Sequence, residues 1–317
     1  MSFKNMNYGF NVKYFEGLDL LSDNQQVLEK RNDELCQFKF EGTYGSDFLN
    51  KGIPDYMEFK LTTTYPGLLI GLGNPHNIKS KGAIKTGFTF DYVTGLPYME
   101  GSYLKGVLSS PFPRYECLIG QKPMDELEKE KLSNIEETLE AYGEIEKTLS
   151  KEDKRERVKE LEELLFENTR ISYLGVFPVI RTPVNLMKTD FITKHEELKN
   201  PNPVGILKIK EDIVFRFCFS VPESNKYDRE KIVQFFKQII LIWGIGAKTN
   251  VGYGQFCEKD EAPVDNKDKT DSKPVQNTSE RKRNLCKRCN KNETRKKPDS
   301  DEYYLYCPEC YRKMKKS

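Results

Sequence analysis

The sequence predicts an α+β fold, and three observations support that prediction. Segments with the two-residue alternation of half-buried strands are interspersed with segments that carry a helical stripe of apolar residues. The order of these elements along residues 56–257 is β-α-β-β-α-β, the modified ferredoxin-like (RRM-like) pattern. Residues 281–317 hold four cysteines in two Cys-x2-Cys pairs, which predict a small zinc ribbon after the main domain.

The elements of the main domain follow from residue periodicity. Residues 27–36 are the best helical stretch of the N-terminal lead-in, and Met57, Phe59 and Leu61 alternate with polar residues as in a strand. The core elements expected after them are a helix at 102–110, strands at 184–192 and 213–221, a helix at 228–243 and a strand at 251–257.

Local signals refine these elements. Ser102 and Asp228 are the expected N-caps of the two core helices, because their side chains can accept hydrogen bonds from the first free amides. Residues 205–210 and 213–221 flank Glu211 and Asp212 and are expected to pair as a hairpin.

Charge divides the chain further. Residues 122–170 carry 16 Asp and Glu against 10 Lys and Arg, with a narrow apolar stripe, and are expected to form two helices inserted into the main domain. A solvated helical flap is the favoured interpretation of this insert, and a docking surface for a partner subunit is the alternative. Residues 258–280 are expected to be a flexible linker.

Composition restricts the class of protein. The net charge of +2 announces no global basic field, although residues 280–317 carry 13 Lys and Arg against 6 Asp and Glu. Met1–Phe10 has no apolar signal-peptide core, and the longest apolar run is broken by Lys237 and Gln238. We therefore expect a cytoplasmic protein without a membrane segment.

The stretch Gly244–Phe256 is the main candidate for a binding loop. It has four glycines, with Lys248, Thr249 and Tyr253 between them, a combination of charge, hydroxyl and ring that suits a phosphate backbone with stacked bases. The glycine spacing fits neither a P-loop nor a dinucleotide fingerprint. The alternative is a helix C-cap at Gly244 that leads into a turn.

Three segments, at 67–76, 95–106 and 244–254, resemble in order the signatures of the RAMP superfamily, the repeat-associated RNA-binding proteins of CRISPR systems. The same segments, with residues 7–10 and 189–202, resemble in particular the sixth-subunit family of type III-B (Cmr) effector complexes. The resemblance covers roughly residues 5–257 and does not extend to the cysteine-rich tail.

The resemblance implies a non-catalytic subunit at the end of the effector backbone, for antiviral defence. It would hold the 3′ part of the CRISPR guide RNA and the guide–target duplex, with other type III effector subunits, the backbone RAMPs, as protein partners. The RNA-binding candidates that it implies are Gly244, Gly246, Lys248, Thr249, Gly252, Tyr253, Gly254, Gly101, Ser102, Lys105, His76, Lys79, Lys81 and Lys85.

The four tail cysteines are the strongest chemical signal in the chain. Cys286 and Cys289 are separated by 17 residues from Cys307 and Cys310, and four thiolates at this spacing supply a tetrahedral, closed structural zinc site. A module of this size cannot bury a sufficient core, so one zinc ion would hold it folded. A redox pair or unligated thiols are the alternatives.

Two other functions stay open at this point. Some RAMPs cut CRISPR repeat RNA, often with a histidine, and His76 and His195 are the two histidines of this chain. No base and acid are paired at motif spacing, so an endoribonuclease is the weaker hypothesis. The third possibility is a structural cap that acts through protein contacts of the insert and the ribbon.

Overall fold

The structure is a computed structural model that describes residues 3–19, 23–41, 52–71, 78, 80–85, 87–141, 148–167, 169–193, 203–225 and 227–259. The chain divides into two compact units, Met1–Glu261 and Ala262–Ser317, and every described residue belongs to the first. The predicted zinc ribbon, and the predicted linker from residue 260 onward, therefore lie outside the described residues.

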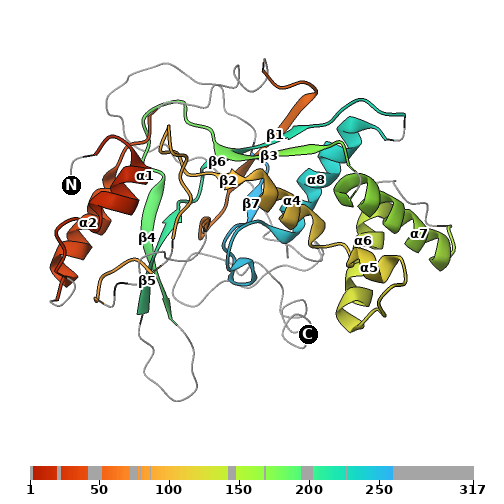
Figure 1. Cartoon of the computed structure of the whole chain (residues 1–317), viewed down its shortest axis with the longest axis horizontal. Coiled ribbons are helices and arrows are strands. Elements are labelled where there is room, and N and C mark those ends of the chain that lie inside the picture. The colour runs from red at the N-terminus through yellow and green to blue at the C-terminus, as the bar shows by residue number, and fades with distance from the viewer. Residues whose placement is uncertain are drawn as a thin grey trace, which may run out of the picture. The chain divides into compact units, whose positions relative to one another are not determined.

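A five-stranded antiparallel sheet lies at the centre of the first unit (Figure 1). Its strands are β1 (Tyr56–Thr63), β2 (Met99–Glu100), β3 (Ser172–Pro178), β6 (Val214–Ser220) and β7 (Phe256–Cys257), in the order β2-β3-β6-β1-β7. A separate antiparallel pair consists of β4 (Met187–Thr193) and β5 (Pro203–Ile209). The predicted α+β class is confirmed.

Helices surround these sheets in three groups. Two of them, α4 (Gly101–Ser109) and α8 (Arg229–Trp243), contact each other and the central sheet. The N-terminal group is α1 (Met6–Tyr8), a π-helical turn (Gly9–Lys13) and α2 (Gln25–Gln37), and α2 contacts β4. The third group is α5 (Tyr115–Leu118), α6 (Glu126–Ala141), α7 (Lys151–Glu162) and a π-helical turn (Glu163–Glu167).

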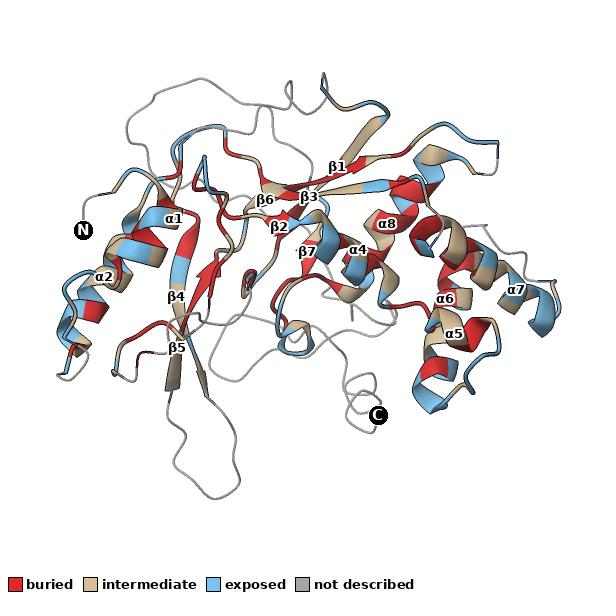
Figure 2. Ribbon diagram, in the orientation of Figure 1, coloured by how far each residue is buried: buried red, intermediate tan, exposed pale blue. Residues whose placement is uncertain are grey.

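The core forms where β1 and β6 meet α8. Phe59 stacks on Phe217 with ring centroids 4.8 Å apart, and Phe219 contacts Phe236 of α8 at 5.3 Å. The apolar stripe of α8 faces the sheet, as the buried residues in Figure 2 show. Asp228 caps this helix as predicted, since its side chain accepts from the amides of Glu230 and Lys231.

One strand of the predicted β-α-β-β-α-β order was wrong. The strand between α4 and β6 in the central sheet is β3, whereas residues 184–192 contribute β4, which pairs with β5. Segment 172–178 hides its strand character because Gly175, at φ +129°, breaks the alternation next to a register shift in the pairing with β6. The final strand is also shorter than predicted, since it begins only at Phe256.

The predicted hairpin of residues 205–210 with 213–221 is wrong as well. β5 pairs with β4, and β6 pairs with β1 and β3, so the chain leaves one sheet and enters the other at Glu211 and Asp212. Thr63 fixes this crossing: its hydroxyl donates to the Lys210 carbonyl at 2.8 Å and accepts from the Ile213 amide at 3.0 Å. Long-range hydrogen bonds therefore override the local turn signal.

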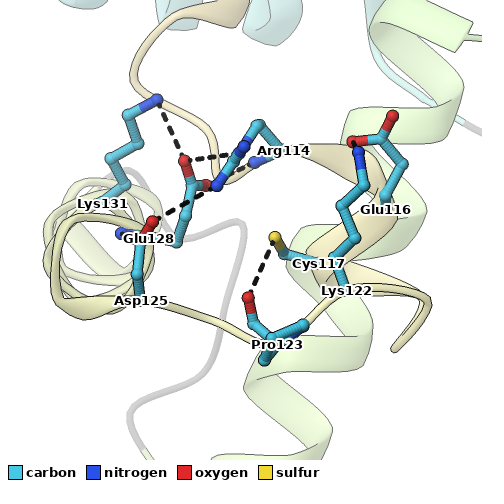
Figure 3. A network of polar contacts seen from close by, with 8 residues as sticks. All are labelled: Arg114, Glu116, Cys117, Lys122, Pro123, Asp125, Glu128 and Lys131. Carbon is cyan, nitrogen blue, oxygen red and sulfur yellow. Dashed lines mark hydrogen bonds and ion pairs between the residues drawn. The ribbon is translucent and has the colours of Figure 1, made fainter.

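The charged insert folds as the predicted pair of helices, α6 and α7, which contact each other. Its beginning is fixed by a polar network around the buried Glu128 (Figure 3). The Glu128 carboxylate accepts from the Arg114 amide at 2.6 Å and from Arg114 Nε at 3.0 Å, and Asp125 lies 3.3 Å from the same guanidinium. The buried carboxylate is thus satisfied by a charged partner and a backbone donor.

The described residues include no helix that has both the length and the apolar character of a membrane span.

Candidate nucleic-acid interface

Three segments far apart in the sequence meet beside the C-terminal end of α8. The amide of Gly254 donates to the Gly67 carbonyl at 2.8 Å, and the amide of Ala247 donates to the Leu69 carbonyl at 3.0 Å. The hydroxyl of Tyr103 in α4 contacts the backbone of Gly246. The three segments singled out in the sequence, 67–76, 95–106 and 244–254, are therefore brought together by direct contacts of their described residues.

The glycine loop, residues 244–254, is a compact turn closed on itself. Gly244 ends α8 at φ +74°, and the Ile245 amide donates to the Gly254 carbonyl at 2.9 Å. Between them, Thr249–Val251 form a 3-10 turn flanked by left-handed residues, Lys248 at φ +60° and Gly252 at φ +102°. Lys248 is exposed, so its ammonium group is presented to solvent from a fixed backbone.

The glycines of this loop are required by its own backbone. A Cβ on Gly246 would lie 2.5 Å from the Leu69 carbonyl oxygen, and one on Gly244 would lie 2.6 Å from the Gly254 carbonyl oxygen. Gly254 likewise has no room for a Cβ against the Ile245 carbonyl. The C-cap interpretation of Gly244 is confirmed, and the expected close approach to RNA is not tested by these contacts.

Tyr253 is buried in the structure. It is 7% exposed, and its hydroxyl donates to Asp190 Oδ2 at 2.8 Å. Lys208 donates to the same oxygen at 2.6 Å, and its Nζ lies 5.7 Å from the centroid of the Tyr253 ring. Because Lys208 is only 4% exposed, this is a largely desolvated ion pair that anchors the loop to the β4–β5 pair.

These contacts change the acidities of both hydrogen-bonded groups. Burial raises the pKa of Tyr253, and its hydrogen bond to Asp190 raises it further. For Asp190 burial acts upward, but the hydrogen bonds from Lys208 and Tyr253 outweigh it, and the pKa of the carboxyl lies below its ordinary value. The pair therefore stays charged at neutral pH.

The N-terminus of α4 differs from its predicted form. Glu100, not Ser102, occupies the N-cap position, and no side chain caps the helix. The reason is that α4 begins directly at the end of β2, where Gly101 packs against the Tyr173 carbonyl without room for a Cβ. Ser102 is exposed, and its hydroxyl lies 3.5 Å from a Glu100 carboxylate oxygen.

Lys105 lies on the same helix near an acidic group of the insert. Its charge lowers the pKa of Glu162, the last residue of α7. Glu162 is 5% exposed, and its Oε2 has no hydrogen-bond partner among the described residues. Burial, with the charges of Glu167 and Glu163, outweighs Lys105 and raises the pKa of Glu162 to about 7. Lys105 therefore has a carboxyl group close by, and that group ionises near neutral pH.

The remaining candidates are separate from the glycine loop or lie outside the described residues. Lys81 is exposed, whereas Lys85 donates to the Ile78 carbonyl and has a pKa lowered by burial. Outside the described residues lie His76, Lys79, His195, Cys286, Cys289, Cys307 and Cys310. Within the described ranges, no group of three or more His, Cys, Asp or Glu side chains is arranged for a metal ion.

Sequence reasoning did not identify Asp190, Lys208 or Glu162. Asp190 and Lys208 belong to alternating strands in which a charged residue ordinarily faces solvent, so their burial depends on a pairing that the sequence does not reveal. Glu162 stands in a run of glutamates, and nothing local distinguishes the buried one from its neighbours.

Comparison with known proteins agrees with the convergence of the three segments. Residues 60–257, more than half of the chain, match the model of the RAMP superfamily. No match was found among curated proteins.

Two solved structures illustrate the likeness of the fold. A chain of a type III-B Cmr-beta complex bound to cognate target RNA is 21% identical, with a TM-score of 0.46 over 79% of this chain and 84% of that one. Cmr6 from Pyrococcus furiosus is 19% identical, with a TM-score of 0.38 over 64% of this chain and 98% of that one.

Proposed function

This chain belongs to the RAMP superfamily, and from that membership we propose that it is a non-catalytic RNA-binding subunit of a type III CRISPR–Cas effector complex. Its ligands are the guide RNA and the complementary target RNA, and its protein partners are the other effector subunits. In this role it is a type III-B sixth subunit that holds the 3′ part of the guide at the end of the backbone, in antiviral defence.

The observation that carries the proposal is the convergence of the three superfamily segments on one loop. Gly67 and Leu69 are hydrogen-bonded to Gly254 and Ala247, and α4 reaches the same loop through Tyr103. Such a backbone, held by internal hydrogen bonds, presents Lys248 without further ordering. A preorganised cation suits the sequence-independent recognition of a phosphate chain.

The loop residues then divide into two roles. Lys248 and Thr249 contact RNA phosphate and sugar, since Lys248 is exposed and Thr249 is partly exposed. The glycines and Tyr253 position the loop, because the glycines admit backbone carbonyls and Tyr253 is bonded to Asp190. Tyr253 therefore acts on RNA indirectly, through the geometry of the loop.

The N-terminus of α4 contributes less than the loop. Lys105 can neutralise a phosphate, and Gly101 and Ser102 provide amides at the helix end. The Glu100 carboxylate and the Glu162 carboxyl oppose an anion there, since they lie close to Ser102 and Lys105. We expect Lys248 to account for more of the RNA affinity than Lys105.

The ferredoxin-like assignment of the fold is part of the same proposal. The elements β1, α4, β3, β6, α8 and β7 follow one another in the order β-α-β-β-α-β, and their strands neighbour one another as β3-β6-β1-β7. The short β2 adds a fifth strand beside β3. This order supports a modified ferredoxin-like domain, whose loops and sheet commonly serve RNA.

The C-terminal ribbon is proposed to hold one structural zinc ion on Cys286, Cys289, Cys307 and Cys310. Its basic residues and tyrosines suit RNA or a neighbouring subunit. The proposal assigns no catalytic residue to the chain.

The identity of the bound RNA tests the proposal first. The tagged chain is purified from its native cell, and the RNA that accompanies it is sequenced. RNAs with a common repeat-derived 5′ tag and varied remainders, together with several proteins, are expected. A chain that purifies alone and without such RNA would contradict an effector role, and RNA cleavage lost in His76→Ala or His195→Ala would instead establish the nuclease.

The salt dependence of binding tests the site. Lys248→Ala with Lys105→Ala is expected to weaken RNA binding and to lower the slope of log K against log salt by about 0.7 for each lost phosphate contact. Lys231→Ala is the matched control, because Lys231 is also exposed but lies at the opposite end of α8 from the glycine loop. An unchanged slope in the double variant would remove the glycine loop from the RNA site.

A further inference from the structure

Tyr65 lies in a short loop that is fixed on both sides to the glycine loop. Just before it, Thr64 donates from its amide to the Gln255 carbonyl at 2.9 Å. Just after it, Gly67 donates to the Thr64 carbonyl at 2.7 Å and accepts from the Gly254 amide at 2.8 Å. The backbone that carries Tyr65 is therefore as well defined as the glycine loop itself.

The Tyr65 ring is held from one side by a buried cation. Lys208 Nζ lies 5.9 Å from the centroid of the Tyr65 ring and 5.7 Å from that of Tyr253. The position of this ammonium is set by Asp190, 2.6 Å away. A cation that is removed from water is attracted strongly by an aromatic face, so the pair orients the Tyr65 ring.

The same ring is 58% exposed, although it is held so firmly. Single exposed apolar side chains are common on protein surfaces, so exposure alone indicates nothing. Two further observations distinguish Tyr65: its ring has a fixed orientation, and its loop is bonded to the segment that presents Lys248. An oriented ring beside a cation is the arrangement with which proteins bind single-stranded nucleic acid.

We propose that Tyr65 is a stacking platform for an unpaired nucleobase of the RNA that follows the glycine loop. The inference rests on the proposed RNA-binding function and adds the chemical class of ligand for this position: a base that is not paired, of any identity, since every base offers a π face. Asp190, Lys208 and Tyr253 support the platform and touch no RNA.

The test measures binding of fluorescein-labelled single-stranded RNA of mixed sequence to the full-length chain by anisotropy. Tyr65→Ala is expected to weaken binding by roughly ten- to a hundred-fold, the range of base–aromatic stacking, whereas Tyr65→Phe keeps the ring and stays within about two-fold. The slope of log K against log salt should not change in either variant, because neither removes a charge.

Two controls keep the test specific. Tyr92→Ala removes a ring that is 84% exposed on a turn bonded to Asn5, and it should bind RNA as the unmodified chain does. RNA carrying 5-bromouridine should cross-link to Tyr65 of the unmodified chain on irradiation, which needs no variant and so does not depend on how Tyr65→Ala folds.

The outcomes separate this inference from the function on which it rests. If the chain binds RNA with a slope that depends on Lys248, but Tyr65→Ala binds equally well and Tyr65 forms no cross-link, the stacking role is overturned and the RNA-binding function stands. A lower salt slope in Tyr65→Ala would also overturn it, because that result indicates a displaced phosphate contact. If the unmodified chain binds no RNA, both are overturned.

Discussion

Replacement of Glu162 by Gln should stabilise the protein above neutral pH. Glu162 ends α7 with 5% exposure and a carboxylate oxygen without a hydrogen-bond partner among the described residues. Its pKa is raised from 4.5 to about 7 by burial and by Glu167 and Glu163. The charged form is therefore the unfavourable one in the folded state, and Gln keeps the shape of the side chain without the charge.

The sign and size of the effect follow from the two pKa values. Below pH 4.5 the carboxyl is neutral in both the folded and the unfolded chain, so it costs nothing. Between pH 4.5 and 7 the unfolded chain loses the proton first, and the folded state loses stability as the pH rises. Above pH 7 the whole cost is present, about 3 kcal/mol at about 1.4 kcal/mol for each pH unit of difference.

Urea unfolding of both proteins at several pH values between 5 and 8 measures this difference. Glu162→Gln should match the unmodified protein near pH 5 and exceed it by about 3 kcal/mol at pH 8. Glu160→Gln is the control on the same helix, since Glu160 is exposed and paired with Arg157 at 2.9 Å, and it should change stability by less than about 1 kcal/mol. Identical pH profiles for Glu162→Gln and the unmodified protein would refute the reasoning.

Two further predictions concern the glycine loop and the ribbon. Gly246→Ala should destabilise the main domain by about 2–4 kcal/mol in thermal unfolding, because φ is +104° and the Cβ would lie 2.5 Å from the Leu69 carbonyl oxygen. Gly106→Ala, in the open interior of α4, should instead stabilise it by about 0.5–1 kcal/mol. The full chain should contain one zinc ion by elemental analysis, and Cys307→Ser should lose it; a chain without zinc would exclude the ribbon.

Local sequence predicted those elements whose signals are local. The helix at 228–243 was correct with its cap because Asp228 and the apolar stripe are read within one segment. The strand at 172–178 was missed because Gly175 interrupts its alternation, and residues 184–192 were placed in the central sheet instead because they alternate more regularly. Which strand enters which sheet is decided by partners distant in the sequence, so periodicity could not choose between them.

The candidate site was predicted in its location more fully than in its detail. The glycine pattern identified the loop, but the glycines that can be examined are needed for the backbone of Leu69 and Ile245, a reason that no sequence pattern contains. The buried pair of Asp190 and Lys208 was not predicted, because charged residues in a strand ordinarily mark its solvent face. Burial of charge depends on tertiary contacts, and functional sites are where such contacts concentrate.

The charged insert can be judged by what its apolar residues already do. Ile135 and Leu139 of α6 and Val158 of α7 are buried in the same core as the sheet, so the apolar stripe that might have received a partner helix is used within the chain. Phe166, just beyond α7, contacts Phe112 at 5.3 Å. A solvated flap therefore describes only the outer surface of the insert. Any subunit that docks on it must use the charged outer residues, and such an interface weakens as salt is added.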